Sequence, residues 1–321
     1  MISSCQICNN NDHSSFMAVK DHLQRNKFHL IECNSCGLVS IHPIPSDQKL
    51  SEYYRKEYYA LPEKGIVGYL ERKLNEAVFR TDLKHIERHS KRGKLLDIGS
   101  GNGYFLKFAK ENNWQTLGVE MSPDASKYAR EQKLEILNNS IEDVHLPKNE
   151  FEVITMFNVL EHMTNLNSIL KKVRDSLKPN GLLVIEVPNI ESLQKKVFKN
   201  YWCHLDVPRH IFHFKRKSFL RLVGKSGFNV VDEFSVPFSL HEVAGWLLSL
   251  SLLLRKKQEI RKQENSAALK EPIINPNFSP KFNLKMFIML LLAHLSRIVP
   301  SSLISRPGIK TYVLKKGDTL V

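Results

Sequence analysis

The sequence lacks the features that would place it in a membrane or outside the cell. No apolar run reaches the roughly 18–20 residues that a membrane-spanning helix needs. The first residues, MISSCQICNN, contain no apolar stretch of the kind that a secretory signal carries. Cysteine is scarce, with 5 residues in 321, and these fit a reducing compartment if four of them bind a metal. We therefore expect a cytoplasmic protein.

Acidic residues are scarce in only one part of the chain. Residues 1–189 contain 25 Lys and Arg against 24 Asp and Glu, whereas residues 190–321 contain 22 against 9. Nearly all of the net charge of +14 therefore belongs to the second part. Such asymmetry is typical of a chain that meets a phosphate-rich partner or an anionic membrane surface. A basic surface that is simply solvated is the alternative.

Four of the cysteines occur as two close pairs. Cys5 and Cys8 form one C-x2-C pair, and Cys33 and Cys36 form a second pair 24 residues later. Paired thiolates at this spacing are typical of a tetrahedral zinc site. The segments HLIEC and GLVSIHP flank the second pair and alternate as short strands do, so they predict a small zinc ribbon. Four thiolates leave no open position on zinc, so we expect a structural metal.

Strand-like and helix-like segments alternate from residue 94 onward, beginning with KLLDIG and ending with GLLVIEVPN. This order predicts an α/β fold with a doubly wound, Rossmann-like and mostly parallel sheet. The expected division is a zinc ribbon over 1–45, a helical linker or lid over 46–93, a cofactor-binding domain over 94–236, an apolar and basic helical insertion over 237–305, and a strand and tail over 306–321.

A glycine loop follows the first of these strands, in the stretch LLDIGSGNGYFL. Its spacing is G-x-G-x-G, and no Lys-Ser or Lys-Thr follows, so it is not a phosphate-binding P-loop. Asp97 stands two residues before the first glycine and favours an ammonium group over an anion as its neighbour. Glu120 ends the next strand, where a carboxylate can accept hydrogen bonds from a ribose diol. S-adenosylmethionine has this combination of groups.

Residues 94–189 resemble the class I S-adenosylmethionine-dependent methyltransferases. The matching pieces, in order, are LLDIGSGNGYFL, GVEMSPDASKYAR, NNSIEDVHLPKNEFEVITMFNVLEHM and LKPNGLLVIEVPN. The resemblance implies that the loop holds the methionine part of the cofactor and that later positions hold its ribose and adenine. The positions implied are Asp97, Gly99, Gly101 and Gly103 for methionine, Glu120 for ribose, Met121 beside the adenine, and Asn158 and Val159 near the cofactor. The family usually has an acid for the adenine amino group where this chain has Ser140 and Ile141, so we expect that contact from the backbone there or from Glu142.

Histidines gather just after the last matched strand, in the segment YWCHLDVPRHIFHF. Methyl transfer to a hydroxyl or an acidic carbon needs a base, and histidine titrates near neutral pH. His204 and His210 are therefore candidate catalytic bases, as is His162 in the FNVLEH segment. The alternative for all three is a structural role, with the rings packed among aromatic side chains or stabilising a loop.

This histidine segment, together with an N-terminal four-cysteine ribbon, resembles bacterial methyltransferases of sugar and surface-polysaccharide pathways. The resemblance implies a sugar or a lipid-linked glycan intermediate as acceptor. The rival interpretation is an RNA methyltransferase that recognises RNA through its zinc module. Nucleic acid is the less expected partner, because the basic part of the chain is also its most apolar part. The sequence gives no prediction of the oligomeric state.

The tail contains two apolar runs with basic flanks, VAGWLLSLSLLLRKK and NLKMFIMLLLAHLSRIVPSSL. Both are too short to span a bilayer, and both are more apolar than an ordinary exposed helix. We expect helices that lie in the interface of an anionic membrane, which would place the protein at the inner face of the membrane. A helical lid or a dimer contact is the alternative.

Overall fold

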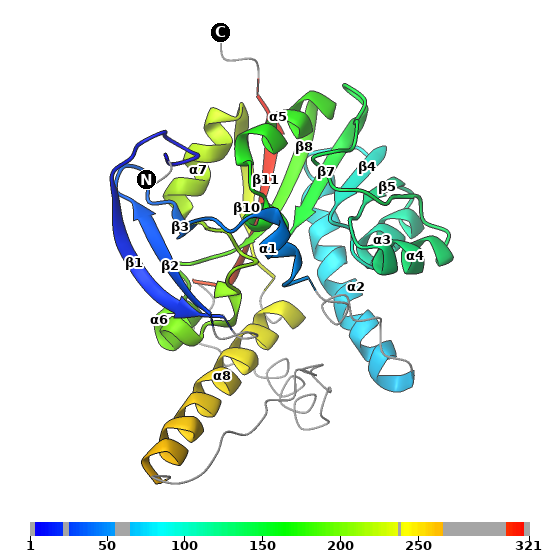
Figure 1. The fold of residues 1–321 in the computed structure, drawn as a ribbon. Helices are drawn as coiled ribbons and strands as arrows, with labels where there is room; N and C mark the ends of the chain where they lie inside the picture. The colour runs from blue at the N-terminus through cyan, green and yellow to red at the C-terminus, as the bar shows by residue number, and fades with distance from the viewer. Residues whose placement is uncertain (1–3, 22–25, 55–64, 237–238, 266–305, 318–321) are drawn as a thin grey trace.

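The computed structural model of the chain describes residues 4–21, 26–54, 65–236, 239–265 and 306–317 (Figure 1). Within these residues the strands form a seven-stranded sheet and a four-stranded sheet. The larger sheet has the order β10-β11-β8-β7-β4-β5-β6. Its strands are β4 (Lys94–Ile98), β5 (Gln115–Val119), β6 (Ile136–Leu137), β7 (Phe151–Phe157), β8 (Leu177–Pro188), β10 (Phe228–Phe234) and β11 (Ile309–Lys316).

Five neighbouring strands of the larger sheet run parallel, from β8 to β6. The expected mostly parallel, doubly wound sheet is therefore confirmed. β11 inserts between β8 and β10 and pairs antiparallel with both, so β11 alone among these seven strands runs in the opposite direction. The sequence predicts a strand in this region but not its place inside the sheet.

Helices cover both faces of the sheet because successive strand residues point to opposite sides. Leu95 packs in one core with α2 (Gly65–Glu87), α3 (Tyr104–Glu111) and α4 (Pro123–Glu131). Its neighbour Leu96 packs in the other core with α5 (Leu166–Ser176) and α7 (Arg216–Lys225). Figure 1 shows the sheet between these two layers. Strand–helix alternation with both sheet faces covered makes this a Rossmann-like fold.

The N-terminal module is a small antiparallel sheet of the order β1-β2-β3-β9. Its strands are β1 (His13–Lys20), β2 (Lys27–Cys33), β3 (Val39–His42) and β9 (Phe212–His213). The last of these comes from the histidine segment, so the module is built from two distant parts of the sequence. A short helix, α1 (Asp47–Ser51), follows β3.

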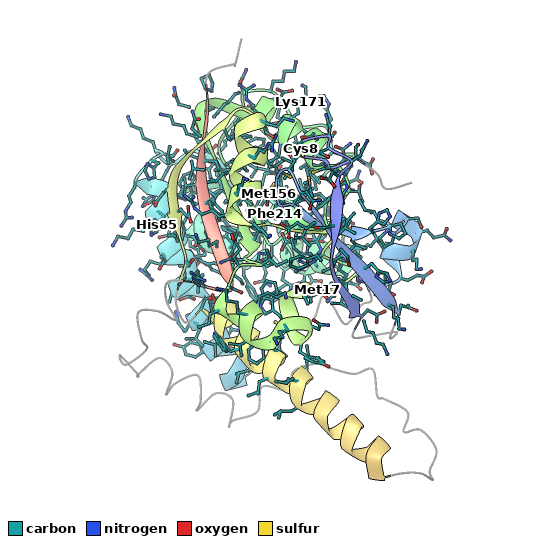
Figure 2. All side chains as sticks on the ribbon, turned by 90° about the vertical axis from the view of Figure 1, so that its left-hand side faces the viewer. Cys8, Met17, His85, Met156, Lys171 and Phe214 are labelled. Atoms are coloured by element: carbon teal, nitrogen blue, oxygen red, sulfur yellow. The ribbon has the colours of Figure 1, made fainter. Side chains whose placement is uncertain are left out.

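The module packs directly on the larger sheet. Ile7 and Cys36 belong to the same core as Met156 of β7 and Phe214, which follows β9 (Figure 2). The Nζ of Lys225 in α7 donates to the carbonyl of Ile7 at 2.7 Å. The cysteine-containing segment is therefore joined to the α5 and α7 side of the molecule by both apolar and polar contacts.

The histidine segment is covered by a helical layer. This layer consists of α6 (Leu193–Phe198), the 3-10 turns η3 (Lys199–Tyr201) and η4 (Cys203–Leu205), and α8 (Leu240–Asn265). Trp246 of α8 contacts Phe198 with their ring centroids 5.4 Å apart. Ser249 is buried and accepts a hydrogen bond from the amide of Cys203 at 2.9 Å. The start of α8 is thus packed on the body, as the lid alternative expects.

The remainder of the first apolar run is less covered. Leu250 and Leu254 of α8 are 42% and 49% exposed, and α8 projects away from the two sheets (Figure 1). Among the described helices, none combines the length and the apolar character that crossing a bilayer requires. The second apolar run lies outside the described residues.

Candidate active site

The glycine loop lies at the carboxyl end of β4, between the strand and α3. Gly99, Gly101 and Gly103 have φ angles of +71°, +52° and +77°, a region that residues with side chains rarely adopt. The amide of Gly99 donates to the carbonyl of Val119 at 2.8 Å, which fixes the loop beside the end of β5. The loop therefore wraps tightly around the start of α3.

Two of the glycines are needed for close packing, and the third borders open space. A Cβ on Gly99 would lie 2.4 Å from Cγ2 of Val159, and one on Gly103 would lie 2.5 Å from Cδ1 of Leu134. A Cβ on Gly101 would meet no described atom within 4 Å. The space over Gly101 is thus the part of the loop that a ligand can occupy.

Asp97 lies at the end of β4 with 4% of its surface exposed. Its Oδ1 accepts a hydrogen bond from the hydroxyl of Thr155 in β7 at 2.6 Å. Burial raises the pKa of Asp97 to about 7 despite this hydrogen bond. A buried carboxylate of this kind is best stabilised by a cation beside it, and the ammonium group of S-adenosylmethionine would supply one.

Glu120 connects the glycine loop to the loop after β5. Its two oxygens accept hydrogen bonds from the amides of Gly101 at 2.8 Å and Ser122 at 2.7 Å. Each carboxylate oxygen has a second lone pair, so the ribose hydroxyls could still be bound. Burial raises the pKa of Glu120, although these amides favour its charged form. Its neighbour Met121 is 56% exposed and offers an apolar surface next to that carboxylate, as an adenine ring would need.

The other positions expected near the cofactor divide into two kinds. Ile141 is buried in the core, whereas the Ser140 hydroxyl donates to Glu142 at the surface. Asn158 has a φ of +54° and donates from Nδ2 to Glu186 at 2.7 Å. Val159 lies against Gly99, so Asn158 and Val159, which follow β7, lie beside the glycine loop, whose Gly101 borders open space. The open space at Gly101, the buried carboxyl group of Asp97 and the carboxyl group of Glu120 together fit S-adenosylmethionine.

Two of the three candidate histidines come together beside this space. His162 is in η2 (Leu160–His162), directly after Val159, and its ring centroid lies 4.6 Å from that of His210. Nδ1 of His162 donates to the carbonyl of Arg209 at 3.0 Å, and the Tyr54 hydroxyl lies 3.0 Å from the same nitrogen. Burial lowers the pKa of His162 to about 4. The ring is therefore neutral at pH 7.

His210 is held between charged groups. Its Nδ1 donates to the carbonyl of His204 at 2.9 Å, and its Nε2 lies 3.6 Å from Asp206. Burial and the neighbouring His162 lower the pKa of His210 well below its usual range. Burial opposes the ionisation of Asp206, but Arg209, 2.6 Å away, and His210 lower its pKa to about 2. His210 thus offers a neutral Nε2 beside an ionised carboxylate.

His204 takes a different position from the other two. It contributes its carbonyl to the cluster, but its Nε2 would lie 2.8 Å from a Cβ on Gly245 of α8. Its ring also contacts Trp202 with a centroid distance of 5.4 Å. The structure therefore joins His162 and His210 by their rings, and His204 only through its backbone.

The structure also brings in acids that the sequence motifs did not single out. Glu161 precedes His162 and lies buried beside His210. Asp82 of α2 is buried, and both burial and the charge of Glu186 raise its pKa well above the usual value. Glu161 stood in the quoted FNVLEH segment and could have been found there. Asp82 could not, because nothing in a helix sequence indicates which face meets the end of β8.

The four paired cysteines come together as expected. Cys5 and Cys36 have their sulfurs 3.5 Å apart, and Cys8 and Cys33 have theirs 3.4 Å apart. All four sulfurs lie within 4.8 Å of one another. A zinc ion with Zn–S bonds of about 2.3 Å would separate its ligands by roughly 3.8 Å, so this donor set fits zinc. The cluster faces the α5 and α7 side of the molecule, so it supports the fold and does not line the cofactor space.

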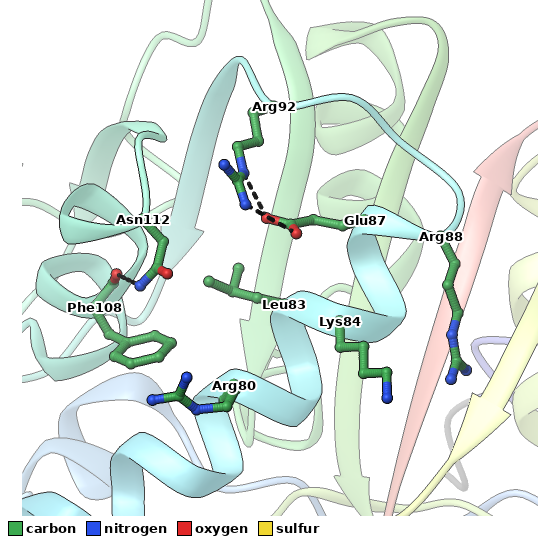
Figure 3. Close-up of a pocket in the computed structure, with 8 residues that line it drawn as sticks. All are labelled: Arg80, Leu83, Lys84, Glu87, Arg88, Arg92, Phe108 and Asn112. Carbon is green, nitrogen blue, oxygen red and sulfur yellow. Dashed lines mark hydrogen bonds and ion pairs between the residues drawn. The ribbon is translucent and has the colours of Figure 1, made fainter.

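A separate hollow of about 370 Å³ lies between α2 and α3, away from the glycine loop (Figure 3). Phe108 and Leu83 form its apolar part, and the side chains of Arg80, Lys84, Arg88 and Arg92 surround it. Arg92 pairs with Glu87 through its Nε at 2.8 Å. Since Asn112 and Arg92 follow α3 and precede β4, the hollow lies at the amino edge of the sheet, opposite the cofactor space.

Comparison with known proteins assigns the family. Residues 69–233, just over half of the chain, match a family model described as a methyltransferase domain. A mitochondrial ubiquinone biosynthesis O-methyltransferase of Schizosaccharomyces pombe is 32% identical over 29% of this chain and 36% of its own. A tRNA U34 carboxymethyltransferase of Desulfotalea psychrophila is 29% identical over 50% of this chain and 54% of its own.

Among solved structures, phosphoethanolamine N-methyltransferase 2 of Haemonchus contortus is 14% identical, with a TM-score of 0.49, and the match covers 95% of this chain and 69% of that one. The chain spans only 36% to 59% of the length of the first curated relatives. The family match covers β4 to β10, with the glycine loop, Asp97 and Glu120. The chain therefore belongs to the methyltransferase-domain family.

Proposed function

We propose that the chain transfers the methyl group of S-adenosylmethionine to a hydroxyl oxygen or an acidic carbon of a sugar, free or on a lipid-linked glycan intermediate of surface-polysaccharide biosynthesis. The observation that carries this proposal is the packing of His162 against His210 with ring centroids 4.6 Å apart, where His162 ends η2, the turn that follows Val159. A neutral imidazole at the donor site suits an acceptor that must lose a proton.

When bound, the cofactor supplies a methyl carbon activated by a sulfonium. Asp97 and the glycine loop would hold its amino-acid part, and Glu120 would hold its ribose. The acceptor atom would take the methyl group with S-adenosylhomocysteine as the leaving group, and the acceptor's proton would pass to His210. Nε2 takes that proton, and the ionised Asp206, 3.6 Å away, stabilises the resulting imidazolium.

The sugar acceptor rests on the resemblance of the histidine segment and the ribbon to bacterial sugar methyltransferases. Relatives named as O-methyltransferases, such as that of Schizosaccharomyces pombe, support transfer to oxygen. Leu250 and Leu254 of α8 are exposed, which supports an approach to a lipid-linked acceptor at an anionic membrane surface. In this proposal a zinc ribbon holds the histidine segment in place.

Transfer of a labelled methyl group to a panel of nucleotide sugars and lipid-linked sugars tests the proposal. His210→Ala should lower turnover by roughly 10²–10⁴-fold with affinity for S-adenosylhomocysteine intact. His204→Ala tests the second candidate base, and His29→Ala on the exposed side of β2 is the control. Full activity of the His210 and His204 variants would return both residues to a structural role. Labelling of no sugar in the panel would refute the acceptor class.

The second candidate function is methylation of RNA. The observation that favours it is the set of four cations around the hollow between α2 and α3, since such groups bind phosphates. A relative named as a tRNA U34 carboxymethyltransferase supports it further. Against it, the hollow lies at the sheet edge opposite the donor site. Retention of RNA that weakens steeply with salt, together with a labelled RNA product, would favour this function over the first.

A further inference from the structure

Glu161, His162 and His210 bring three metal-ligand side chains together, of which Glu161 and His210 are buried and His162 is partly buried. One ligand atom from each lies within 4.8 Å of the others. Glu161 and His162 are successive residues of η2, and His210 comes from the loop before β9. The cluster is separate from the four cysteines and follows Val159, the residue that packs on Gly99 of the cofactor loop.

No side chain among the described residues lies within hydrogen-bond distance of the Glu161 carboxyl group. Its side chain is 1% exposed, and within the described residues no hydrogen bond reaches either oxygen. A buried carboxyl group without a partner costs several kcal/mol, so native proteins rarely keep one without a reason. Nε2 of His210 lies 3.9 Å from Oε1 of Glu161, which is too far for a shared proton.

The imidazole rings are oriented as metal ligands are. Nδ1 of His210 donates to the carbonyl of His204, and Nδ1 of His162 donates to the carbonyl of Arg209. A carbonyl can only accept, so Nδ1 of His210 carries the proton and the lone pair of His210 is left on Nε2. Nε2 lies 3.9 Å from Oε1 of Glu161 and 3.6 Å from Asp206, so lone pairs lie close together here without a positive charge between them. In His162, the Tyr54 hydroxyl also lies 3.0 Å from Nδ1. A second-shell carbonyl of this kind is typical of histidine ligands.

We propose that Glu161, His162 and His210 bind a divalent metal ion next to the cofactor space. Two imidazoles and one carboxylate suit Mn²⁺, Fe²⁺, Co²⁺ or Zn²⁺ better than Mg²⁺ or Ca²⁺, which prefer oxygen ligands throughout. With bonds of about 2.1 Å, tetrahedral ligands lie roughly 3.4 Å apart, so the 3.9 Å pair must close by about 0.5 Å. Asp206 lies 3.6 Å from Nε2 of His210 and would add a second negative charge near the ion.

Three protein ligands leave positions on the ion for other groups. These positions would take oxygen atoms of the acceptor, and a hydroxyl or keto oxygen of a sugar has the right chemistry. This part of the inference rests on the proposed function, whereas the metal site itself does not. An ion at this place would bind the acceptor oxygen and ease loss of its hydroxyl proton to water. Since Nε2 of His210 would then be a metal ligand, this route replaces the one in which His210 takes the proton.

Titration with Mn²⁺ alone, followed by electron paramagnetic resonance, tests the site. Mn²⁺ is a poor ligand match for four thiolates, so it reports the Glu–His site and not the cysteines. The full chain, dialysed against a weak chelator, should bind about one Mn²⁺ at this site. Glu161→Gln and His210→Asn should each weaken that binding by at least about 10-fold, while Glu135→Gln on the surface should leave it unchanged.

Calorimetry with S-adenosylhomocysteine on the same samples shows that each variant is folded and separates the two proposals. Mn²⁺ binding that Glu161→Gln removes, with cofactor binding retained, supports the metal site. A wild-type chain that ignores Mn²⁺, or a Glu161→Gln variant that binds it equally well, overturns it. Loss of sugar methylation in the panel with Mn²⁺ binding intact would refute the acceptor and leave the metal site standing.

Discussion

Gly101 and Gly224 differ in what a side chain would do at each. An added Cβ would meet no described atom within 4 Å at either position, but Gly101 has a φ of +52° and borders the cofactor space, whereas Gly224 lies in α7. Gly101→Val should abolish binding of S-adenosylhomocysteine, because the side chain fills the ligand space and strains the loop. Gly224→Val is the control and should bind normally. Calorimetry measures both, and normal binding by Gly101→Val would contradict the assignment of the loop.

The charge of Asp97 should make cofactor binding depend on pH. Burial raises its pKa to about 7, and the ammonium group of the cofactor needs the ionised form. Affinity for S-adenosylhomocysteine should therefore rise between about pH 6 and pH 8 and then level off. Asp97→Asn should bind more weakly and lose most of this dependence. A wild-type affinity that stays flat across this range would show that Asp97 does not pair with the cofactor.

The raised pKa of Asp97 has the opposite effect on the stability of the unliganded protein, which should fall as pH rises. A carboxyl group with a raised pKa holds its proton more tightly when folded, so the native state binds more protons than the unfolded state between the two pKa values. This contribution to stability is complete below the unfolded value near 4 and is lost as pH rises through about 7. The unliganded folded protein is therefore least destabilised by Asp97 at low pH, where this carboxyl group is protonated and uncharged.

At the scale of elements, the ribbon and the histidine segment are coupled through β3 and β9. Val39 pairs with His213 and Ser40 with Phe212, and the amide of Ile41 donates to the carbonyl of Ile211 at 3.0 Å. Cys33 ends β2, the neighbour of β3. A structural change at the four cysteines should therefore be transmitted through β3 to Ile211, the residue after His210.

Cys33→Ser should lose zinc and loosen β1, β2 and β3, while the larger sheet still folds, because its core with α2, α3 and α4 contains no residue of the cysteine module. Elemental analysis should give about one zinc per wild-type chain at this site and none in the variant. Amide exchange should accelerate in β3 and reach Phe212 and His213. Ser35→Ala, in the same turn, is the control. Full zinc content in the Cys33 variant would refute the ligand set.

Elements differed in how far sequence could predict them. The strand before Gly99 and the helix after Gly103 were predictable, because an apolar strand, three glycines and an amphipathic helix form a local pattern. The order that puts β11 between β8 and β10 was not, since pairing of Ile309 with Pro188 depends on contacts 121 positions apart. The pairing of β9 with β3 was hidden for the same reason. In the site, local motifs gave Asp97 and Glu120, whereas Asp82 and Tyr54 reach it through tertiary packing alone.

For the molecule as a whole, the distribution of charge and of apolar residues predicts binding to anionic membrane surfaces. If residues 240–300 rest on a membrane, the full chain should bind anionic vesicles at low salt and release only in part at high salt. Salt screens the Lys and Arg contribution and leaves the apolar one. Reversing the charges of Arg255, Lys256 and Lys257, whose side chains lie outside the described set, should weaken vesicle binding but not cofactor affinity.

Cosedimentation with vesicles of anionic and neutral lipid measures this binding. Charge reversal of Lys107, Lys110 and Lys127, which lie on α3 and α4, is the matched control and should have little effect. A chain that ignores anionic vesicles at low salt and stays monodisperse without detergent would instead favour a lid or a dimer contact for the apolar run.

The position of β11 has a consequence for how the molecule is made. Thr311 of β11 donates to Glu186 at 3.1 Å, and Glu186 in turn holds Asn158 beside the donor space. On the ribosome, β8 emerges long before its partner and waits with an unpaired, apolar edge. The nascent chain therefore carries its glycine loop early but a finished catalytic pocket only late. Until β11 is synthesised, this edge of β8 remains open to pairing with other strands.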